Sequence, residues 1–313
     1  MAVDEKVKEI VAKLEQGLKE VFESDNYKNY LNTMAKFHNY SLNNTLLINQ
    51  QAPNATRVAG FESWKNNFNR HVKKGERGIK ISAPAPYNMK VTKDVIDPKT
   101  GEKVLDENGQ PKTAEVQVKI PAFKVTTVFD ISQTEGESLP SLGVNELSGN
   151  VEMAKDIKES LHKISPVPIE FGPIEGESKG FYSLSEKFIK VKEGMSDTQT
   201  LKTMVHEISH AMLHDPDRIK DNPDLQQPGN KEVEAESIAY IVCQHFGIDT
   251  SDYSFGYIAG WSEGREMEDL KSSMNTIRET SAEMINRIEG NLRAMQNLLI
   301  SIKRRYYWKN YSL

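Results

Sequence analysis

The feature that most constrains this chain is the pattern His206-Glu207-Ile208-Ser209-His210, which lies in a segment with helical periodicity. Two histidines four residues apart lie on the same face of an α-helix, about 6 Å apart, so both can bind one metal ion. Glu207 lies at the edge of that face, where a general base that acts on a metal-bound water must lie. The pattern therefore predicts His206 and His210 as metal ligands and Glu207 as the catalytic base.

The residues around this pattern are those of a buried helix. Ser196 or Asp197 can cap its start, and Asp215-Pro216 marks its end. Because apolar residues recur at helical spacing between these limits, a surface helix with two unrelated histidines is the weaker interpretation. These apolar residues are Leu201, Met204, Val205, Ile208, Ala211 and Met212. His214 lies one turn beyond His210, at the helix end, and we expect a structural or supporting role for it rather than that of a fourth ligand.

A second segment, residues 231–242, carries three carboxylates within a helical pattern. Glu232 and Glu236 share a stripe with two alanines that suit close approach to another helix, whereas Glu234 points elsewhere. We therefore expect Glu232 to be the third metal ligand, with Glu234 as the alternative. Glu236, one turn farther on, is expected to orient a ligand histidine. Three protein ligands leave one coordination position open, as a catalytic zinc site requires, so Zn²⁺ is the expected cofactor.

Length and composition bound the number of domains and the compartment. The chain has 313 residues, enough for two ordinary domains, and its net charge of −5 does not by itself indicate a nucleic-acid partner. Its one cysteine, Cys243, excludes an internal disulfide, indicates a reducing compartment and is expected in the core. No signal peptide and no membrane-spanning run is recognisable. We therefore expect a cytoplasmic protein without a membrane partner.

The overall fold class is expected to be α+β, with a first α+β domain over residues 1–135. Its predicted helices cover residues 4–23, 25–38 and 42–51, the last capped by Ser41, and a segment with Phe61, Trp64 and Phe68. Its predicted strands cover residues 79–84 and 123–131. Residues 88–120, between those strands, are rich in charged and turn-forming residues, which predicts an inserted hairpin or mobile segment.

A local excess of positive charge lies between residues 57 and 80 of this acidic chain. Gly75 and Gly78 would let the backbone approach an anion closely. Such a run can be a solvated face, but phosphate binding is the sharper interpretation, and no base-reading motif is present. Sugar or base contacts are available from Tyr40, Asn43, Asn44 and Gln51. The predicted nucleic-acid contacts are Arg57, Trp64, Lys65, Arg70, Lys73, Lys74, Arg77 and Lys80.

The second half is expected to be a small metal-site domain, residues 151–265, which follows a polar linker over residues 136–150. Before the two metal-site helices we expect a helix near 150–164, a strand at 166–171 and a hairpin of strands at 180–184 and 187–192. The strand before the metal helix is expected to be an edge that could pair with an extended peptide. A C-terminal extension, residues 266–313, shows apolar periodicity over 266–302, which predicts a long helix.

Parts of the first half resemble the N-terminal domain of ArdC-like antirestriction proteins. They include Phe37-His38-Asn39-Tyr40-Ser41, Lys74-Gly75-Glu76-Arg77-Gly78-Ile79 and Phe129-Asp130-Ile131-Ser132-Gln133-Thr134. The second half resembles that family's metallopeptidase-like domain, which is related to ImmA/IrrE-type zincins. The resemblance implies a single-stranded-DNA-binding domain joined to a zincin and carried by a mobile element to evade host restriction. It also implies that His206, His210 and the acid-bearing helix hold zinc, with Glu207 as base.

These observations lead to three functional hypotheses. The first is an antirestriction-type protein that binds single-stranded DNA without sequence specificity, with double-stranded DNA as a further candidate partner, and that carries a zinc metallopeptidase-like domain. The alternative is a zinc-dependent protease that cleaves a DNA-associated regulator such as a repressor, which would make a protein substrate the partner. The third is a non-enzymatic DNA mimic, and the basic run argues against it because a mimic needs a contiguous acidic surface.

Overall fold

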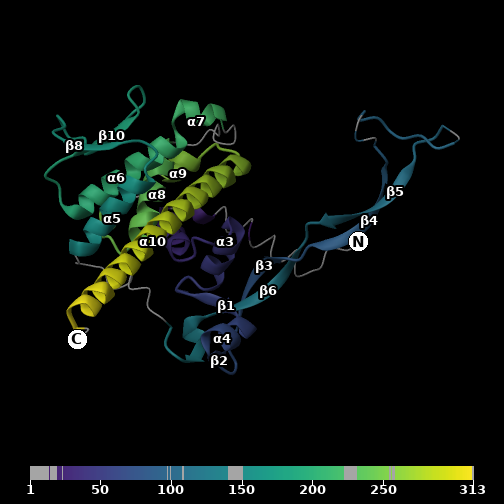
Figure 1. Ribbon diagram of the computed structural model, residues 1–313, viewed down its shortest axis with the longest axis horizontal. Helices are drawn as coiled ribbons and strands as arrows, with labels where there is room; N and C mark the ends of the chain where they lie inside the picture. The colour runs from purple at the N-terminus through teal and green to yellow at the C-terminus, as the bar shows by residue number, and fades with distance from the viewer. Residues whose placement is uncertain are drawn as a thin grey trace.

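The computed structural model describes Leu14 and residues 20–22, 24–96, 98, 100–107, 109–139, 151–221, 231–253, 255 and 258–311. Helices and strands are both abundant and largely separated along the chain, so the predicted α+β class is confirmed. Figure 1 shows a helical body from which a long two-stranded arm projects. The predicted helix over residues 4–23 and the linker over 136–150 lie almost entirely outside the described residues.

The first helices belong to the same hydrophobic core as the metal-site helices. Helix α2 (Ser24–Lys36) packs against α8 (Lys231–His245) and against α3 (Leu42–Gln51). Its tyrosines Tyr27 and Tyr30 are fully buried, and the Tyr27 hydroxyl lies 2.9 Å from Ser237 Oγ of α8. Helix α3 begins after Ser41, whose side chain accepts the Asn44 N–H, as predicted. We expected α2 in a separate first domain, whereas its apolar face is covered by the second half of the chain.

A second, smaller core lies on the other face of α3. Strands β1 (Val58–Gly60), β6 (Phe123–Asp130) and β3 (Ile79–Pro84) form an antiparallel sheet in that order. Buried apolar side chains of α3, β3 and β6 make up this core: Ile48, Ile79, Ile81 and Val128. Helix α4 (Phe61–Phe68) follows β1 directly, as the sequence predicts.

A short two-stranded sheet closes the first part of the chain. Strand β2 (Arg70–Val72) pairs with β7 (Thr134–Gly136), which follows the 3-10 helix η1 (Ile131–Gln133). At Gly136 the backbone φ is 135°, and a Cβ there would lie 2.5 Å from the carbonyl oxygen of Asn69. Glycine is therefore required where β7 crosses β2, and this first residue of the expected linker is part of a strand.

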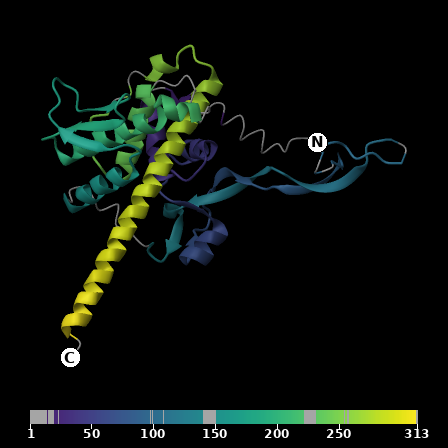
Figure 2. The same cartoon turned by 45° about the horizontal axis from the view of Figure 1, so that its top comes forward.

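The arm is the predicted hairpin. Strands β4 (Tyr87–Asp94) and β5 (Thr113–Ile120) pair with each other from Tyr87↔Ile120 to Asp94↔Thr113, and Figure 2 shows them extending away from the body. One face of the ribbon carries apolar side chains, including Tyr87, Met89 and Val116, which are exposed. The opposite face is polar because side chains alternate along each strand.

The second half places a three-stranded sheet over the metal-site helix. Helix α5 (Val151–Ile164) leads into β8 (Ile169–Gly172), and β9 (Gly180–Ser183) and β10 (Phe188–Lys192) form the predicted hairpin. The order β8-β10-β9 puts β10 in the centre, parallel to β8 and antiparallel to β9. The prediction that the strand before the metal helix is an edge is therefore wrong. Strands β8 and β9 are the edges of this sheet, and β9 is the one that packs against α6.

Helices make up the rest of the body. Helix α6 (Asp197–Leu213) carries the paired histidines, α7 (Pro216–Asp221) follows it, and α9 (Ile258–Ser262) precedes α10 (Met267–Tyr311). Helix α10 packs across α8 and α5 and continues well beyond the body (Figure 2). Among the described residues, no helix is long and apolar enough to cross a membrane.

Candidate metal centre

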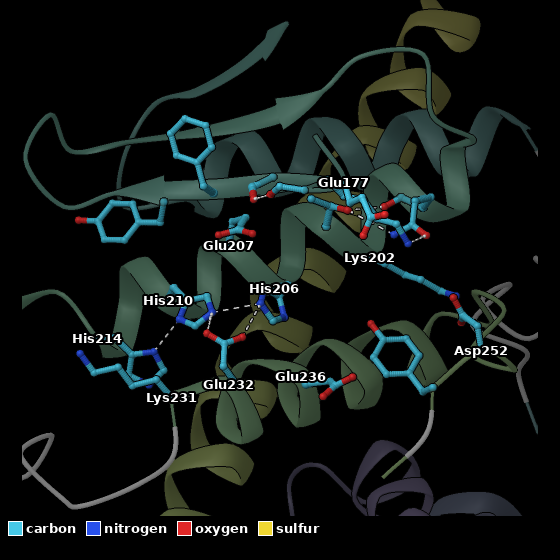
Figure 3. A pocket seen from close by; sticks show the side chains of 18 of the residues that line it. Glu177, Lys202, His206, Glu207, His210, His214, Lys231, Glu232, Glu236 and Asp252 are labelled. Carbon is cyan, nitrogen blue, oxygen red and sulfur yellow. Dashed lines mark hydrogen bonds and ion pairs between the residues drawn. The ribbon is translucent and has the colours of Figure 1, made fainter. Parts of the chain in front are cut away.

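Helices α6 and α8 bring the three predicted ligands together (Figure 3). His206 Nε2 and His210 Nε2 lie 3.1 Å apart on one face of α6. Glu232, in the first turn of α8, points its carboxylate between them, 3.5 Å from His206 Nε2 and 3.4 Å from His210 Nε2. This is the only group of three or more such donor side chains that converges within the described part of the chain. The three side chains therefore lie together although α6 ends at Leu213 and α8 begins only at Lys231.

The spacing of the three donor side chains is similar to that of ligands around a tetrahedral metal ion. Zinc–nitrogen and zinc–oxygen bonds of about 2.0–2.2 Å at tetrahedral angles put neighbouring ligand atoms about 3.3–3.6 Å apart. The two Nε2 atoms, 3.1 Å apart, are slightly closer than that, and each carboxylate oxygen of Glu232 lies at about that distance from one histidine, Oε2 at 3.5 Å from His206 and Oε1 at 3.4 Å from His210. Two imidazole nitrogens and one carboxylate oxygen also form a donor set suited to Zn²⁺. The residues present therefore fit the predicted cofactor.

The three donor side chains shift one another's pKa values. Burial would lower the pKa of His206, but the hydrogen bond and charge of Glu232 outweigh burial and raise it. Burial, together with the neighbouring His206, lowers the pKa of His210 to about 4. The hydrogen bond to His206 lowers the pKa of Glu232 to about 2, against a smaller opposing effect of burial. Glu232 is thus a carboxylate and His210 a neutral imidazole at neutral pH, the forms in which both bind metals.

Glu207, the predicted base, points from α6 toward the sheet. Burial raises the pKa of its carboxyl to about 7, although the nearby His206 and the backbone N–H of Tyr182 on β9 both lower it. The carboxyl therefore exchanges a proton readily near neutral pH, as a general base must. Strand β9 can lie this close only because residue 180 is glycine. A Cβ on Gly180 would lie 2.5 Å from Thr203 Cγ2 and 3.2 Å from Glu207 Cγ.

The edge strand is held over α6 by contacts to the buried carboxylate of Asp215. The Tyr182 hydroxyl donates to the carboxylate of Asp215, which follows α6. Lys187, in the β9–β10 turn, donates to both oxygens of Asp215 at 2.8 Å. Burial would raise the pKa of Asp215, but the hydrogen bonds from Lys187 and Tyr182 lower it to about 2. The sequence predicts only a helix end at Asp215, because its partners Tyr182 and Lys187 lie 33 and 28 residues earlier in the chain.

A cleft of about 750 Å³ contains the metal centre and extends along β9. Its walls include Phe181 and Tyr182 of β9, Thr203 of α6 and the predicted Glu236 of α8. Lys202, one turn before His206, is almost completely buried and forms an ion pair with Asp252. The cleft therefore offers polar groups on both sides of the metal centre and an open sheet edge along one wall.

The other two acids of α8 have different surroundings. Glu234, the alternative third ligand, is buried and contacts His214 at 3.0 Å and Ser273 at 2.7 Å rather than the metal centre. Of the two acids, Glu232 is therefore the one that lies beside His206 and His210. Glu236 lines the cleft, and its charge contributes to the raised pKa of His206. Cys243 is fully buried, and burial raises the pKa of its thiol to about 12, as expected for a core cysteine.

Some of the predicted nucleic-acid contacts prove to be structural. Trp64 is 1% exposed, and its indole N–H donates to the Phe129 carbonyl, so its ring is not available for base stacking. Asn44 and Gln51 of α3 each make two hydrogen bonds to the backbone of β3, at Ser82 and Lys80 respectively. The sequence predicts that Trp64, Asn44 and Gln51 are helical, but it does not show which side of each helix packs against a strand.

The basic residues divide into two groups. Three side chains donate to neighbouring parts of the fold: Arg70 to Thr134 and backbone carbonyls of β7, Lys73 to the Ser132 carbonyl, and Lys80 to Thr127. Lys65, Lys74 and Arg77 are exposed, on α4 and in the turn before β3. Arg57 is half-buried, and its backbone N–H donates to Asp130.

The two glycines of the basic run have separate roles. Gly75 has φ of 89° and open space around it, which fits a turn that could approach an anion. A Cβ on Gly78 would lie 2.1 Å from Thr127 Cγ2 and 3.0 Å from the ring of Phe129. Gly78 is therefore needed for close packing on β6, and the prediction that it serves anion approach is corrected.

Comparison with known proteins identifies the first part of the chain. Residues 2–129 match the family model of the N-terminal domain of anti-restriction factor ArdC. The chain is 31% identical over 324 residues to the Bacillus anthracis protein pXO2-81, covering 94% of this chain and 53% of that protein. It is 27% identical over 211 residues to DNA primase TraC of Escherichia coli, covering 64% of this chain and 18% of the primase. The chain thus spans about half the length of the first relative and less than a fifth of the second.

Two solved structures are also similar. They are the metal-free and Mn(II)-bound crystal structures of the antirestriction ArdC protein from plasmid R388, at 19% and 17% identity respectively. Each comparison covers 80% of this chain and 86% of that protein, with a TM-score of 0.45.

Proposed function

We propose that this chain is a cytoplasmic DNA-binding protein of the antirestriction type, carried by a mobile element. Its first part binds single-stranded DNA without sequence specificity, and its second part is a zinc metallopeptidase-like domain. The observation that carries the DNA-binding half is the match of residues 2–129 to the ArdC N-terminal domain. The observation that carries the metal half is the convergence of His206, His210 and Glu232.

The exposed groups of the first part suit a flexible, negatively charged strand. Lys65, Lys74 and Arg77 are exposed and can neutralise phosphates. Phe61 and Phe68, at the two ends of α4, are 51% and 38% exposed, which makes their rings available for stacking on bases. We therefore assign base stacking to Phe61 and Phe68 rather than to Trp64, for which the sequence suggested it. Because no side chain here matches a base-reading motif, the binding is expected to be insensitive to sequence.

In the second part, His206, His210 and Glu232 would hold Zn²⁺. When bound there, the ion supplies Lewis acidity, which acidifies water and polarises a carbonyl group. Glu207 accepts a proton at its carboxylate and returns it to the leaving amine, a task suited to a pKa of about 7. Strand β9 forms the sheet edge in the same cleft; its Tyr182 N–H donates to Glu207 and its Gly180 carbonyl accepts the Ser178 hydroxyl, so an extended peptide would pair with β9 by replacing these contacts.

Salt dependence tests the DNA-binding half. Fluorescence anisotropy with a labelled oligo-dT and a matched duplex should give an affinity for the single strand that falls steeply between about 50 and 200 mM salt. Replacing Lys65, Lys74 and Arg77 together by alanine should weaken binding and flatten this dependence. Replacing the equally exposed Lys163, in α5, should change neither. An affinity that is independent of salt argues against phosphate binding.

A second candidate, a protease that cleaves a DNA-associated regulator, is favoured by one observation. Glu207 combines a position beside the three donors with a pKa near neutrality, which DNA binding alone does not require. Glu207→Gln should keep the bound zinc and abolish cleavage, while leaving affinity for single-stranded DNA unchanged. If this variant retains full antirestriction activity in cells, proteolysis is not the function that protects the DNA.

A further inference from the structure

A chain of buried polar groups runs from the metal centre into the body of the protein. His210 Nδ1 lies 2.9 Å from Nδ1 of His214, and Nε2 of His214 lies 3.0 Å from Oε2 of Glu234. Ser273 of α10 donates to the other carboxylate oxygen of Glu234 at 2.7 Å. The side chains of His214 and Glu234 are 8% and 7% exposed, so this chain is shielded from water. It joins α6, α8 and α10 behind the metal centre.

The distances and hydrogen-bonding capacities point to one set of proton positions along this chain. With Glu234 as the acceptor, Nε2 of His214 donates to it and Nδ1 of His214 is left to accept. Nδ1 of His210 then donates in the imidazole–imidazole contact. In this arrangement Nε2 of His210, the atom that faces His206 and Glu232, carries no proton and can bind a metal ion.

We propose that Glu234 and His214 are positioning residues that fix the tautomer and ring orientation of His210 for metal binding. This inference rests on the proposed function, because it assumes that the centre binds a metal ion. Outer partners of this kind make a ligand histidine a stronger donor and hold its ring in place. The arrangement also explains why Glu234, two residues beyond Glu232, is buried. Its carboxylate acts on the metal centre indirectly, through the imidazole of His214.

The alternative is a purely structural contact that ties α6 to α8 and α10. Both interpretations expect the loss of Glu234 or His214 to lower stability, since each removes a partner from a buried polar group. Only the positioning role expects a loss of metal affinity and a change in the tautomer of His210. The test must therefore measure zinc binding and the imidazole protonation state, with thermal stability recorded alongside.

Zinc affinity of the full chain, measured by competition with a chromophoric chelator, separates these interpretations. Glu234→Gln and His214→Ala should each weaken zinc binding about 10- to 100-fold while the protein remains folded. Ser237→Ala is the matched control, because it breaks a buried hydrogen bond of the same helix, to Tyr27, on the side away from the centre. It should lower stability without changing zinc affinity. Equal zinc affinity in wild type and both test variants overturns the proposal.

Nitrogen NMR of the metal-free protein supplies a readout that does not depend on zinc. Wild type should show His210 protonated at Nδ1, and Glu234→Gln should show a mixture of both tautomers. If wild type binds no zinc, the proposed function fails, whereas the tautomer of His210 is still measured. Should both Glu234→Gln and His214→Ala fail to fold, Ser273→Ala decides, since it removes one hydrogen bond to Glu234 from outside the chain of imidazoles. Zinc affinity within twofold of wild type in that variant counts against the proposal.

Discussion

Asp130 is expected to contribute more to the stability of the first part than any surface charge. It is 5% exposed, and its carboxylate accepts four hydrogen bonds. Oδ1 accepts the backbone N–H groups of Thr56 and Arg57 at 2.8 and 3.0 Å, and Oδ2 accepts the N–H and hydroxyl of Ser132 at 3.0 and 2.6 Å. The side-chain oxygen of Gln133 accepts the Asp130 N–H, which completes a capping box. One side chain thus joins the segment before β1 to the end of β6.

Asp130→Asn preserves the size of this side chain but replaces one acceptor oxygen by a donor. A hydrogen bond to a charged acceptor contributes about 1.5–3 kcal/mol, and the variant loses up to two of them while the Ser132 hydroxyl can turn to accept. We expect a loss of about 2–4 kcal/mol in the free energy of unfolding, out of a total of about 5–15 kcal/mol. Asp130→Ala should cost more, because the N–H groups of Thr56 and Arg57 are then left without an acceptor.

Urea unfolding followed by circular dichroism and tryptophan fluorescence measures this loss. Trp64 is a local probe, since its indole is bonded to the residue before Asp130. The control is Asp94→Asn in the arm, where the carboxylate pairs with Lys103 in an exposed ion pair and should contribute less than about 1 kcal/mol. Destabilisation by both Asp130 variants that is no larger than in this control would refute the reasoning.

The pH dependence of the same variant gives an independent check. Burial would raise the pKa of Asp130, but its hydrogen bonds outweigh burial and lower the pKa in the folded protein. A carboxyl with a lowered pKa in the folded state stabilises the protein fully above its unfolded pKa of about 4, and this contribution is lost as the pH falls through the folded pKa. The difference between wild type and Asp130→Asn should therefore be largest near neutral pH and shrink in acid.

Three further predictions follow from the same structure. Replacing residues 88–119 by a short turn should leave the melting temperature within about 2 °C, because β4 and β5 pair with each other outside both hydrophobic cores; a large drop in calorimetry would show that the arm stabilises the body. Removing zinc with a chelator should lower stability by about 2.7 kcal/mol relative to protein held at 100 times the zinc dissociation constant, and His206→Ala should abolish this difference. Phe61→Ala and Phe68→Ala should each weaken oligo-dT binding by about 1–3 kcal/mol in anisotropy titrations and affect duplex binding less, whereas equal effects on both would exclude stacking.

The shared face of His206 and His210 could be predicted because helical spacing determines which side chains share a face, whereas the approach of Glu232 also depends on the packing of α8 on α6. The five-residue pattern sets the positions of His206 and His210, and the stripe with Ala235 and Ala239 selected Glu232 over Glu234. The hairpin at 88–120 was equally local, since its turn residues and strand alternation both lie within one segment.

Features that depend on contacts between distant segments were not predictable in this way. Periodicity made Trp64 helical but could not show that β6 covers it. The hairpin of β9 and β10 was found, yet the order of strands depends on β8, which pairs with β10 from about 20 residues earlier. The contacts of Glu234 are with His214, which caps the end of α6, and with Ser273 of α10.

The packing of α2 on α8 joins the two parts of the chain into one hydrophobic core. The helix that covers the back of α8 belongs to the stretch that matches the ArdC N-terminal domain, and Tyr27 reaches Ser237, five residues from Glu232. A fragment that starts at residue 151 would lack α2, so the face of α8 that α2 covers would be exposed to solvent. The two parts of the chain therefore share one hydrophobic core, and we expect neither part to fold completely without the other.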